Sequence, residues 1–212
     1  MRFGLRAVLI VAALAVMLAI WFSYRCPASG LALSQGRRDF HRLKNRRFLP
    51  QLGDFDSNVT LQQLLQPGAD QSRWSTSRAA RLEGYVVSVT AGPLELVNCF
   101  CRRDAHINVA LQPQASAREI VVLEVTPALR DLISRTGNTE AQDQSLVLSD
   151  WSTETLQKRL TGRWVRFEGW LFYDGQHESE AENTAPGRAA NWRATAWELH
   201  PVTRIELIGE KK

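Results

Sequence analysis

Cysteine, methionine and long apolar runs are scarce in this sequence. The 212 residues include 3 cysteines and 2 methionines, too few cysteines for a small fold held together by several disulfides. Only one long apolar stretch is present, near the start, which excludes a protein that crosses a membrane many times. No nucleotide-binding or protease signature occurs. With 44% hydrophobic and 23% charged residues, the composition is typical of one ordinary globular domain.

The positive charge of the chain is concentrated at its N-terminus. Residues 1–47 hold nine Lys or Arg and one acid, whereas residues 48–212 hold 17 Lys or Arg and 21 Asp or Glu. The body is therefore mildly acidic, although the whole chain carries a net charge of +4. An acidic body repels a phosphate backbone on average, so nucleic acid is not an expected partner.

The apolar stretch Ala7–Phe22 contains 16 uncharged, almost wholly apolar residues. With its flanks it approaches the roughly 20 residues that span a bilayer. We predict that residues 1–24 form a transmembrane anchor; a cleaved signal peptide and a buried helix are the alternatives. A short N-terminal tail before an apolar run favours a single-pass protein with an extracytoplasmic body.

Residues 25–81 are predicted to form a basic juxtamembrane arm with short helices. Its most basic part, Arg37–Leu49, allows two interpretations: a helix lying on anionic lipid, or a solvated linker. Further along, Val59–Leu65 predicts a short helix, which Pro67 and Gly68 end.

Residues 82–208 alternate between strand patterns and turns. Strand patterns occupy 82–90, 104–111, 119–125, 163–173, 192–199 and 202–208, and helical patterns occupy 128–134 and 153–160. A polar loop is expected at 137–145 and a charged tail at 209–212. Pro201 lies between the last two strand patterns and predicts a bend. The order is that of a five-stranded OB-type barrel. The predicted fold class is therefore mainly β with α, an OB-like barrel preceded by an N-terminal membrane helix.

The C-terminal part of the chain also resembles uncharacterised bacterial envelope proteins. The resemblance rests on Trp192–Thr203, which reads Trp-Arg-Ala-Thr-Ala-Trp-Glu-Leu-His-Pro-Val-Thr, and extends to Asn98-Cys99 and to Asp104-x-His106. It implies an OB-like domain in the bacterial envelope and implies no activity. Together with the expected anchor, it predicts an inner-membrane protein whose soluble domain is periplasmic or extracellular.

The densest group of chemically active side chains lies between residues 95 and 106. Thiolate, imidazole and carboxylate are the common ligands of zinc and copper. Asp104 and His106 are two residues apart on a strand pattern and therefore project from one face. A site for zinc or another divalent metal is predicted to draw on Cys99, Cys101, Asp104, His106, His177 and His200. One alternative is a polar outer face. The other is a disulfide between Cys99 and Cys101, with Cys26 bridging two chains or staying reduced.

A second candidate site lies on the aromatic strand pattern at 163–173. Trp164, Arg166 and Trp170 fall on one face, which is typical of a platform that stacks bases or sugars. The alternative is a tryptophan pair covered by other parts of the chain. The predicted ligand-binding residues are Trp164, Arg166, Trp170, Arg193 and Glu198.

Two acidic side chains in the strand patterns, Glu198 and Glu124, need partners that compensate their charge. Glu198 and His200 share a strand face, and they form either a general acid–base pair or a brace for the bend at Pro201. Glu124 interrupts an apolar run and needs a partner, either a ligand or an arginine, with Arg166 and Arg193 as the candidates.

Three functions are consistent with these patterns. The first is a membrane-tethered, extracytoplasmic OB-like binding or assembly module, with an envelope protein or a glycan as partner. The second is a metal-dependent hydrolase of the phosphodiesterase or nuclease type around Asp104, His106 and His200. Glu124, Asp174 and His177 are its further candidate ligands, and it requires at least three of the six to meet at one point. The third is a metal-handling or redox protein that uses Cys99 and Cys101. Because no catalytic motif is identified, an enzyme is not the favoured interpretation.

Overall fold

A computed structural model describes residues 2–136 and 150–209 of the chain. The strands are β1 (Ala79–Ala91), β2 (Ala105–Ala110), β3 (Val121–Val125), β4 (Trp164–Tyr173) and β5 (Trp197–Leu207). The α-helices are α1 (Arg2–Arg25), α2 (Gln35–Lys44), α3 (Leu61–Leu64), α4 (Pro127–Thr136) and α5 (Thr153–Leu160). Short 3-10 helices are η1 (Leu52–Asp54), η2 (Leu96–Asn98), η3 (Ala117–Glu119) and η4 (Gly175–Glu180). The polar loop expected at 137–145, and all but the first residue of the tail expected at 209–212, lie outside the described residues.

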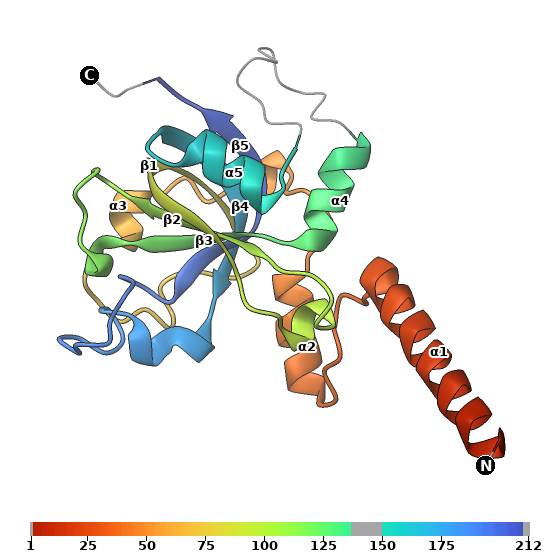
Figure 1. The fold of residues 1–212 in the computed structure, drawn as a ribbon. Helices are drawn as coiled ribbons and strands as arrows, with labels where there is room; N and C mark the ends of the chain where they lie inside the picture. The colour runs from red at the N-terminus through yellow and green to blue at the C-terminus, as the bar shows by residue number, and fades with distance from the viewer. Residues whose placement is uncertain (1, 137–149, 210–212) are drawn as a thin grey trace.

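The five strands close into one barrel in the order β1-β2-β3-β5-β4 (Figure 1). All neighbouring strands run antiparallel except β3 and β5, which are parallel. Both α4 and α5 stand between β3 and β4 in the chain. The barrel predicted from the strand patterns is therefore confirmed as a closed, mixed five-stranded barrel with helices, and its order is consistent with an OB-like barrel.

Strand β4 shows how residue alternation separates the core of the barrel from its outer wall. Val165, Phe167 and Leu171 are fully buried inside, as the period-two pattern predicts. On the outer face, charged residues of β1, β4 and β5 stand directly opposite one another in two cross-strand rows: Arg81–Glu168–Arg204 and Glu83–Arg166–Glu206. Opposite charges side by side on neighbouring strands help to hold the register of the barrel wall.

The last strand differs from the prediction at both of its ends. The patterns at 192–199 and 202–208 form one strand, β5, which starts only at Trp197. Pro201 lies inside it, after a cis peptide bond, and the pairing with β4 shifts register beside Gly169. Where the sequence predicts a bend at Pro201, the structure shows this shift of register, at a residue that has no N–H to donate to the neighbouring strand.

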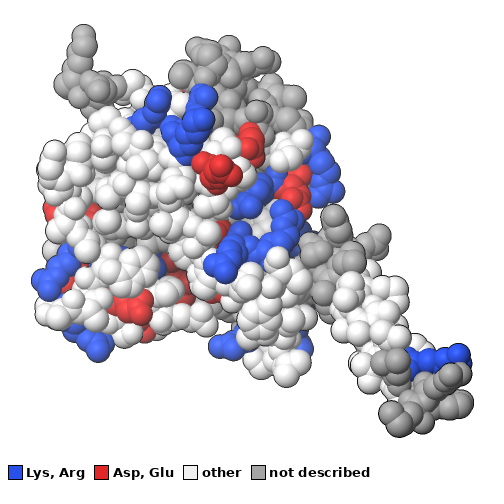
Figure 2. All heavy atoms as spheres, in the orientation of Figure 1, with Lys and Arg blue, Asp and Glu red and all other residues white. Residues whose placement is uncertain are grey.

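Helix α1 points away from the barrel (Figure 1). Its described side chains are largely apolar and exposed, among them Val8, Ile10 and Leu14, and the side shown in Figure 2 is mostly uncharged. Within residues 2–136 and 150–209, no helix has both the length and the apolar character that crossing a bilayer requires. The predicted membrane helix is therefore not found; its apolar stretch of 16 residues is shorter than the roughly 20 that a span needs.

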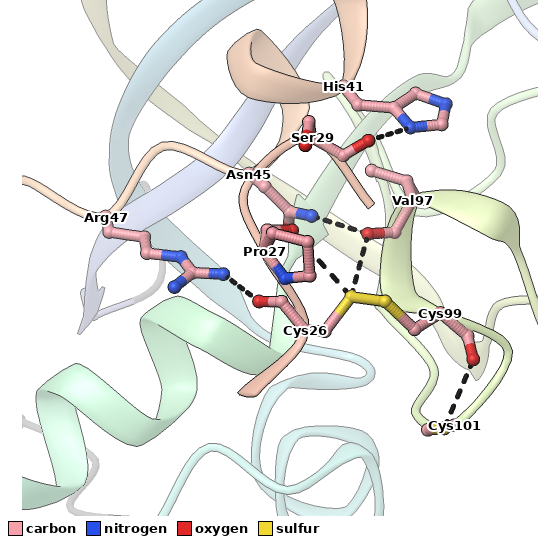
Figure 3. The surroundings of a disulfide bond; sticks show 9 residues. All are labelled: Cys26, Pro27, Ser29, His41, Asn45, Arg47, Val97, Cys99 and Cys101. Atoms are coloured by element: carbon pink, nitrogen blue, oxygen red, sulfur yellow. Dashed lines mark hydrogen bonds between the residues drawn. A yellow bond between two sulfur atoms is a disulfide. The ribbon is translucent and has the colours of Figure 1, made fainter. Parts of the chain in front are cut away.

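The basic arm is packed against the barrel. Cys26 forms a disulfide with Cys99, 73 residues further along the chain (Figure 3). Gly30 packs so closely on η2, with a positive φ of 55°, that a Cβ there would lie 2.3 Å from the main-chain oxygen of Leu96. Three consecutive residues at the end of α2, Lys44, Asn45 and Arg46, are buried. This end of the arm is therefore neither a solvated linker nor a surface available to lipid.

Candidate functional site

Three side chains with metal-binding chemistry meet inside the barrel domain. Asp104 precedes β2, Glu124 lies on β3 and His200 lies on β5. One ligand atom of each lies within 4.8 Å of the others, and all three residues are buried. The requirement that three candidate ligands converge is therefore met, by a set that includes Asp104 and His200 from the predicted metal site.

Strand pairing explains why these residues meet. His106 on β2 stands directly opposite Glu124 on β3. The parallel contact between Leu123 and Leu199 then places β3 beside the segment of β5 that carries Glu198 and His200. A parallel contact between residues so distant in the sequence cannot be read from local patterns, which explains why Glu124 was expected to pair with an arginine.

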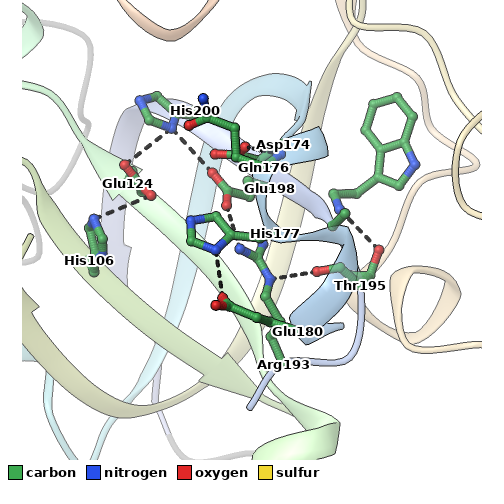
Figure 4. Close-up of polar contacts among 12 residues, drawn as sticks. His106, Glu124, Asp174, Gln176, His177, Glu180, Arg193, Thr195, Glu198 and His200 are labelled. Atoms are coloured by element: carbon green, nitrogen blue, oxygen red, sulfur yellow. Dashed lines mark hydrogen bonds and ion pairs between the residues drawn. The ribbon is translucent and has the colours of Figure 1, made fainter. Parts of the chain in front are cut away.

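His200 bridges two glutamates in this centre (Figure 4). Its Nδ1 lies 3.2 Å from Glu124 Oε2 and 3.2 Å from Glu198 Oε2. His106 Nε2 approaches the other oxygen of Glu124 at 3.3 Å. The second oxygen of Glu198 forms an ion pair of 2.7 Å with Nη1 of Arg193, and both of these side chains are fully buried. The predicted ligand-binding residues Arg193 and Glu198 therefore neutralise each other inside the domain.

The N-terminal arm contributes a lysine to the same region. Lys44 Nζ lies 3.2 Å from Asp174 Oδ2, in a second buried ion pair. Beside it, the ring of Phe172 packs edge-on against His200 at 5.3 Å between centroids, and Phe40 of α2 packs on Phe172 at 5.0 Å. Helix α2 therefore helps to cover the buried centre and supplies one of its positive charges.

Burial and charge set opposite protonation preferences for the two glutamates. Desolvation raises the pKa of Glu124 to about 8, against the opposing effect of the His200 charge. Desolvation also acts on Glu198, but the charge of Arg193 and the hydrogen bond from His200 outweigh it and hold the pKa of Glu198 well below its usual range. One glutamate next to His200 therefore favours the protonated form, and the other favours the carboxylate.

The two basic groups are held in their charged forms by these acids. Desolvation alone would lower the pKa of His200, but the charge of Glu124 and the hydrogen bond to Glu198 raise it overall. For Lys44, desolvation is again opposed by nearby carboxylates, Glu124 first, and the pKa is raised. The centre is thus a compact group of acids and bases that compete for a small number of protons.

Asp104 Oδ1 and His200 Nε2 are buried polar atoms of the centre that have no hydrogen-bond partner among the described residues. The other oxygen of Asp104 accepts a hydrogen bond of 3.0 Å from Asn98 Nδ2, which fixes the orientation of the carboxylate. Buried polar atoms are normally satisfied, so such exceptions indicate a ligand, an ion or a water molecule. The chemistry of the three converging side chains suits a divalent cation.

The other predicted metal ligands lie outside this group. Cys99 is bonded to Cys26. The alternative of a disulfide between Cys99 and Cys101 is therefore wrong, and the sulfur of Cys99 is not a thiolate ligand. Cys101 keeps its thiol, which lies 3.1 Å from the main-chain oxygen of Cys99. His177 pairs with Glu180 at 2.7 Å. His106 contacts Glu124 and is the one predicted ligand that stands directly beside the three converging residues.

The predicted stacking platform is not an open surface. Trp170 is buried; its Nε1 donates to the main-chain oxygen of Phe48 at 3.1 Å, and the two rings pack edge-on. Arg166 forms ion pairs with Glu83 and Glu206 in a cross-strand row on the outer face of the barrel. Trp164 packs against Tyr85. The alternative interpretation, tryptophans covered by other parts of the chain, describes Trp170 correctly.

Sequence reasoning missed the contributions of Lys44 and Asn98 to this region. The stretch around Lys44 reads as a solvated basic segment, because the other basic residues between 37 and 49 surround it. One local signal was present: Phe40 and Lys44 are four residues apart and share a helix face, as they do on α2 against Phe172.

The fold and the centre together define a class: a closed five-stranded barrel with a buried carboxylate–histidine group beside its core, and a disulfide-linked arm packed against it. Comparison with known protein families, with curated proteins and with solved structures gives no match to this chain. The resemblance to bacterial envelope proteins therefore stays a prediction.

Proposed function

We propose that this protein is an OB-like binding module whose buried centre, formed by Asp104, Glu124 and His200, holds a divalent cation. The observation that carries the proposal is the convergence of three ligand atoms within 4.8 Å of one another. An imidazole and two carboxylates are suitable ligands for zinc and manganese, among other divalent ions.

The balance of formal charge supports a cation in this centre. Four buried carboxylates belong to Asp104, Glu124, Asp174 and Glu198. Among the described residues, two buried basic side chains form ion pairs with this group, Lys44 with Asp174 and Arg193 with Glu198. Asp104 and Glu124 have no such arginine or lysine contact in the described part of the chain: Arg130 acts on Asp104, and Lys44 on Glu124, from a greater distance. Glu124 contacts His200 and His106 instead and favours its protonated form. A divalent cation between Asp104 and Glu124 would displace that proton and compensate both carboxylates.

The disulfide supports the predicted location outside the cytosol. Cys26 and Cys99 are bonded, and structural disulfides persist mainly in oxidising compartments such as the bacterial periplasm. The location in the bacterial envelope remains a prediction that this bond favours. A glycan or an envelope protein remains the predicted partner of the module.

The proposed cation site is less suited to the hydrolase alternative. Asp104, Glu124 and His200 are at most 2% exposed, and a substrate must reach the metal directly in a hydrolytic mechanism. The packing of α2 over Phe172 and His200 covers this region. The cysteine-based alternative loses its pair of thiols, because Cys99 is in a disulfide with Cys26.

The test is elemental analysis by mass spectrometry of the full chain, purified without a histidine tag or chelator and then equilibrated with zinc and manganese. We expect close to one divalent ion per chain, lost in Asp104→Asn and Glu124→Gln. The matched control is His177→Gln, which changes a histidine outside the centre and should leave the metal content unchanged.

A second measurement keeps the proposal testable if these variants do not fold. The wild-type chain is unfolded with urea, with metal and after removal of metal by a chelator. Binding to the folded state alone stabilises it by about 2.7 kcal/mol when the free metal is about 100 times its dissociation constant. A folded wild-type chain that stays empty, and whose stability is the same under both conditions, would overturn the proposal.

A further inference from the structure

A hollow of about 280 Å³ lies on the surface between the arm and α4. Charged side chains of both signs gather on this part of the molecule, near the end of α1 where the chain enters the barrel domain (Figure 2). Its wall includes Arg47 from the arm, Arg102 from the loop before β2, and Asp131 and Arg135 from α4. The volume is close to the lower end of the range found for small-molecule sites. The hollow adjoins the buried carboxylate–histidine centre at one residue, Asn98, which lines the hollow and donates to Asp104.

The charges on the wall favour an anion. Three guanidinium groups face one carboxylate. Arg102 and Asp131 form a two-bond ion pair, with N–O distances of 2.5 and 2.8 Å, which leaves an excess of two positive charges from Arg47 and Arg135. The excess is notable because residues 48–212 carry more acids than bases. A concentration of like charge in a concave surface attracts the opposite charge.

Arg47 and Arg135 are each held by one hydrogen bond to a main-chain oxygen and keep further N–H donors. Arg47 Nη2 donates to the main-chain oxygen of Cys26 (Figure 3), and Arg135 Nε donates to the main-chain oxygen of Asp131 at 3.0 Å. A guanidinium has five N–H donors in a planar fork, which suits the oxygens of phosphate and carboxylate. Anchoring by a main-chain oxygen reduces the conformational freedom that each arginine would lose on binding.

A buried, unsatisfied acceptor lies on the same wall. Asn45 is 3% exposed; its Nδ2 donates to the main-chain oxygen of Val97 at 2.8 Å, while its Oδ1 has no hydrogen-bond partner among the described residues. Such an atom indicates a missing donor, for which a hydroxyl group or an ordered water molecule is suitable.

We infer that this hollow binds a phosphate group that carries a neighbouring hydroxyl, with Arg47 and Arg135 contacting the phosphate and Asn45 accepting from the hydroxyl. A phosphate monoester carries about 1.5 to 2 negative charges at pH 7, which matches the excess of positive charge. This inference does not depend on the proposed cation site.

Two kinds of molecule carry such a phosphate. One is a small soluble phosphate ester. The other is the headgroup of an anionic lipid, since the exposed apolar helix α1 ends at Arg25, next to Cys26 on the wall of the hollow. Both present phosphate oxygens and a nearby hydroxyl, the ester as a monoester and the lipid headgroup as a singly charged diester, so the experiment has one arm for each.

The first arm measures the binding of inorganic phosphate and of glycerol 3-phosphate to the full chain by calorimetry. The second measures co-sedimentation with vesicles of phosphatidylglycerol and, for comparison, of phosphatidylcholine. We expect Arg47→Gln and Arg135→Gln each to weaken phosphate-dependent binding about tenfold, the usual effect of losing a charged hydrogen bond. The matched control is Arg159→Gln, which alters an exposed arginine on α5, away from the hollow.

The two arms separate the sources. Binding of glycerol 3-phosphate that is lost in Arg135→Gln supports a soluble ester. Binding only to phosphatidylglycerol vesicles, again lost in Arg135→Gln, supports a lipid headgroup. The inference is overturned if none of these probes binds, if both vesicle types bind equally without any binding of the soluble probes, or if Arg47→Gln and Arg135→Gln bind as the wild type does. Circular dichroism of each variant confirms that it is folded.

Discussion

Lys44 and Asp174 form a buried ion pair across 130 residues of sequence, with 3.2 Å between Nζ and Oδ2. This pair joins the N-terminal arm to the end of β4. Together with the Cys26–Cys99 disulfide, it makes the arm part of the barrel domain rather than a linker that precedes it.

Replacing Lys44 with methionine should destabilise the protein by about 3–5 kcal/mol, because the Asp174 carboxylate would stay buried without its partner. Urea unfolding measures the change in the free energy of unfolding. The matched control is Arg42→Ala on the same helix; its ion pair with Asp39 is more than half exposed, and its loss should cost less than about 1 kcal/mol.

A double variant separates charge from packing at this position. Lys44→Met combined with Asp174→Asn removes both charges and should recover most of the stability lost in the single variant. If the double variant is as unstable as Lys44→Met alone, the buried charge of Asp174 is not the cause.

Breaking the disulfide should also weaken the attachment of the arm. The bond joins residues 73 positions apart, and closing a loop of that length stabilises a fold by about 4 kcal/mol. We expect Cys26→Ser to lower the free energy of unfolding by about that amount, and Cys101→Ser to change it by less than about 1 kcal/mol. Peptide mapping without reductant should recover Cys26 linked to Cys99; a Cys99–Cys101 link would contradict the structure.

The Arg102–Asp131 pair predicts an acid-dependent contribution to stability. The hydrogen bond from Arg102 holds the pKa of Asp131 below its ordinary value of 3.8. At a pH between the lowered folded-state pKa and 3.8, the unfolded chain binds more protons than the folded chain. The contribution of the pair to stability is therefore fully present above about pH 4 and is lost as the pH falls through the folded-state pKa. Since the pair is partly exposed, it amounts to less than about 1 kcal/mol.

Carboxyl-carbon NMR titration measures the pKa of Asp131 directly. In Arg102→Gln it should rise towards 3.8, whereas Arg159→Gln should leave it where it is in the wild type. An unchanged value in Arg102→Gln would show that the ion pair is not what lowers it.

Gly169 provides a test of the irregular contact between β4 and β5. A Cβ at this position would lie 2.7 Å from the main-chain oxygen of Pro201, so Gly169→Ala should cost about 1–3 kcal/mol through overpacking. Gly36→Ala is the control: a Cβ added to Gly36 would have no described atom within 4 Å, and alanine favours helix α2 by up to about 1 kcal/mol. Thermal unfolding of both variants gives the comparison, and equal midpoints would contradict this view of the β4–β5 contact.

Local patterns were sufficient to predict the barrel. Alternating residues such as Val165, Phe167 and Leu171 identify strands because a strand turns successive side chains to opposite faces. Pro67 and Gly68 likewise mark the end of the short helix α3. In the structure the side chain of Thr60 accepts from Gln63 N at the start of this helix, as is typical of an N-cap threonine. The pairs Asp104–His106 and Glu198–His200 could be placed together for the same reason.

Local sequence patterns therefore predict where strands occur along the chain and which side chains share a face, because both depend on neighbours a few residues apart. The contacts of Glu124 with His200 and of Cys26 with Cys99, and the place of Lys44 in the acidic centre, follow from the folded chain and not from these patterns. Each of these contacts joins distant segments. Its geometry depends on how the strands close and where the arm packs, and no local periodicity carries that information.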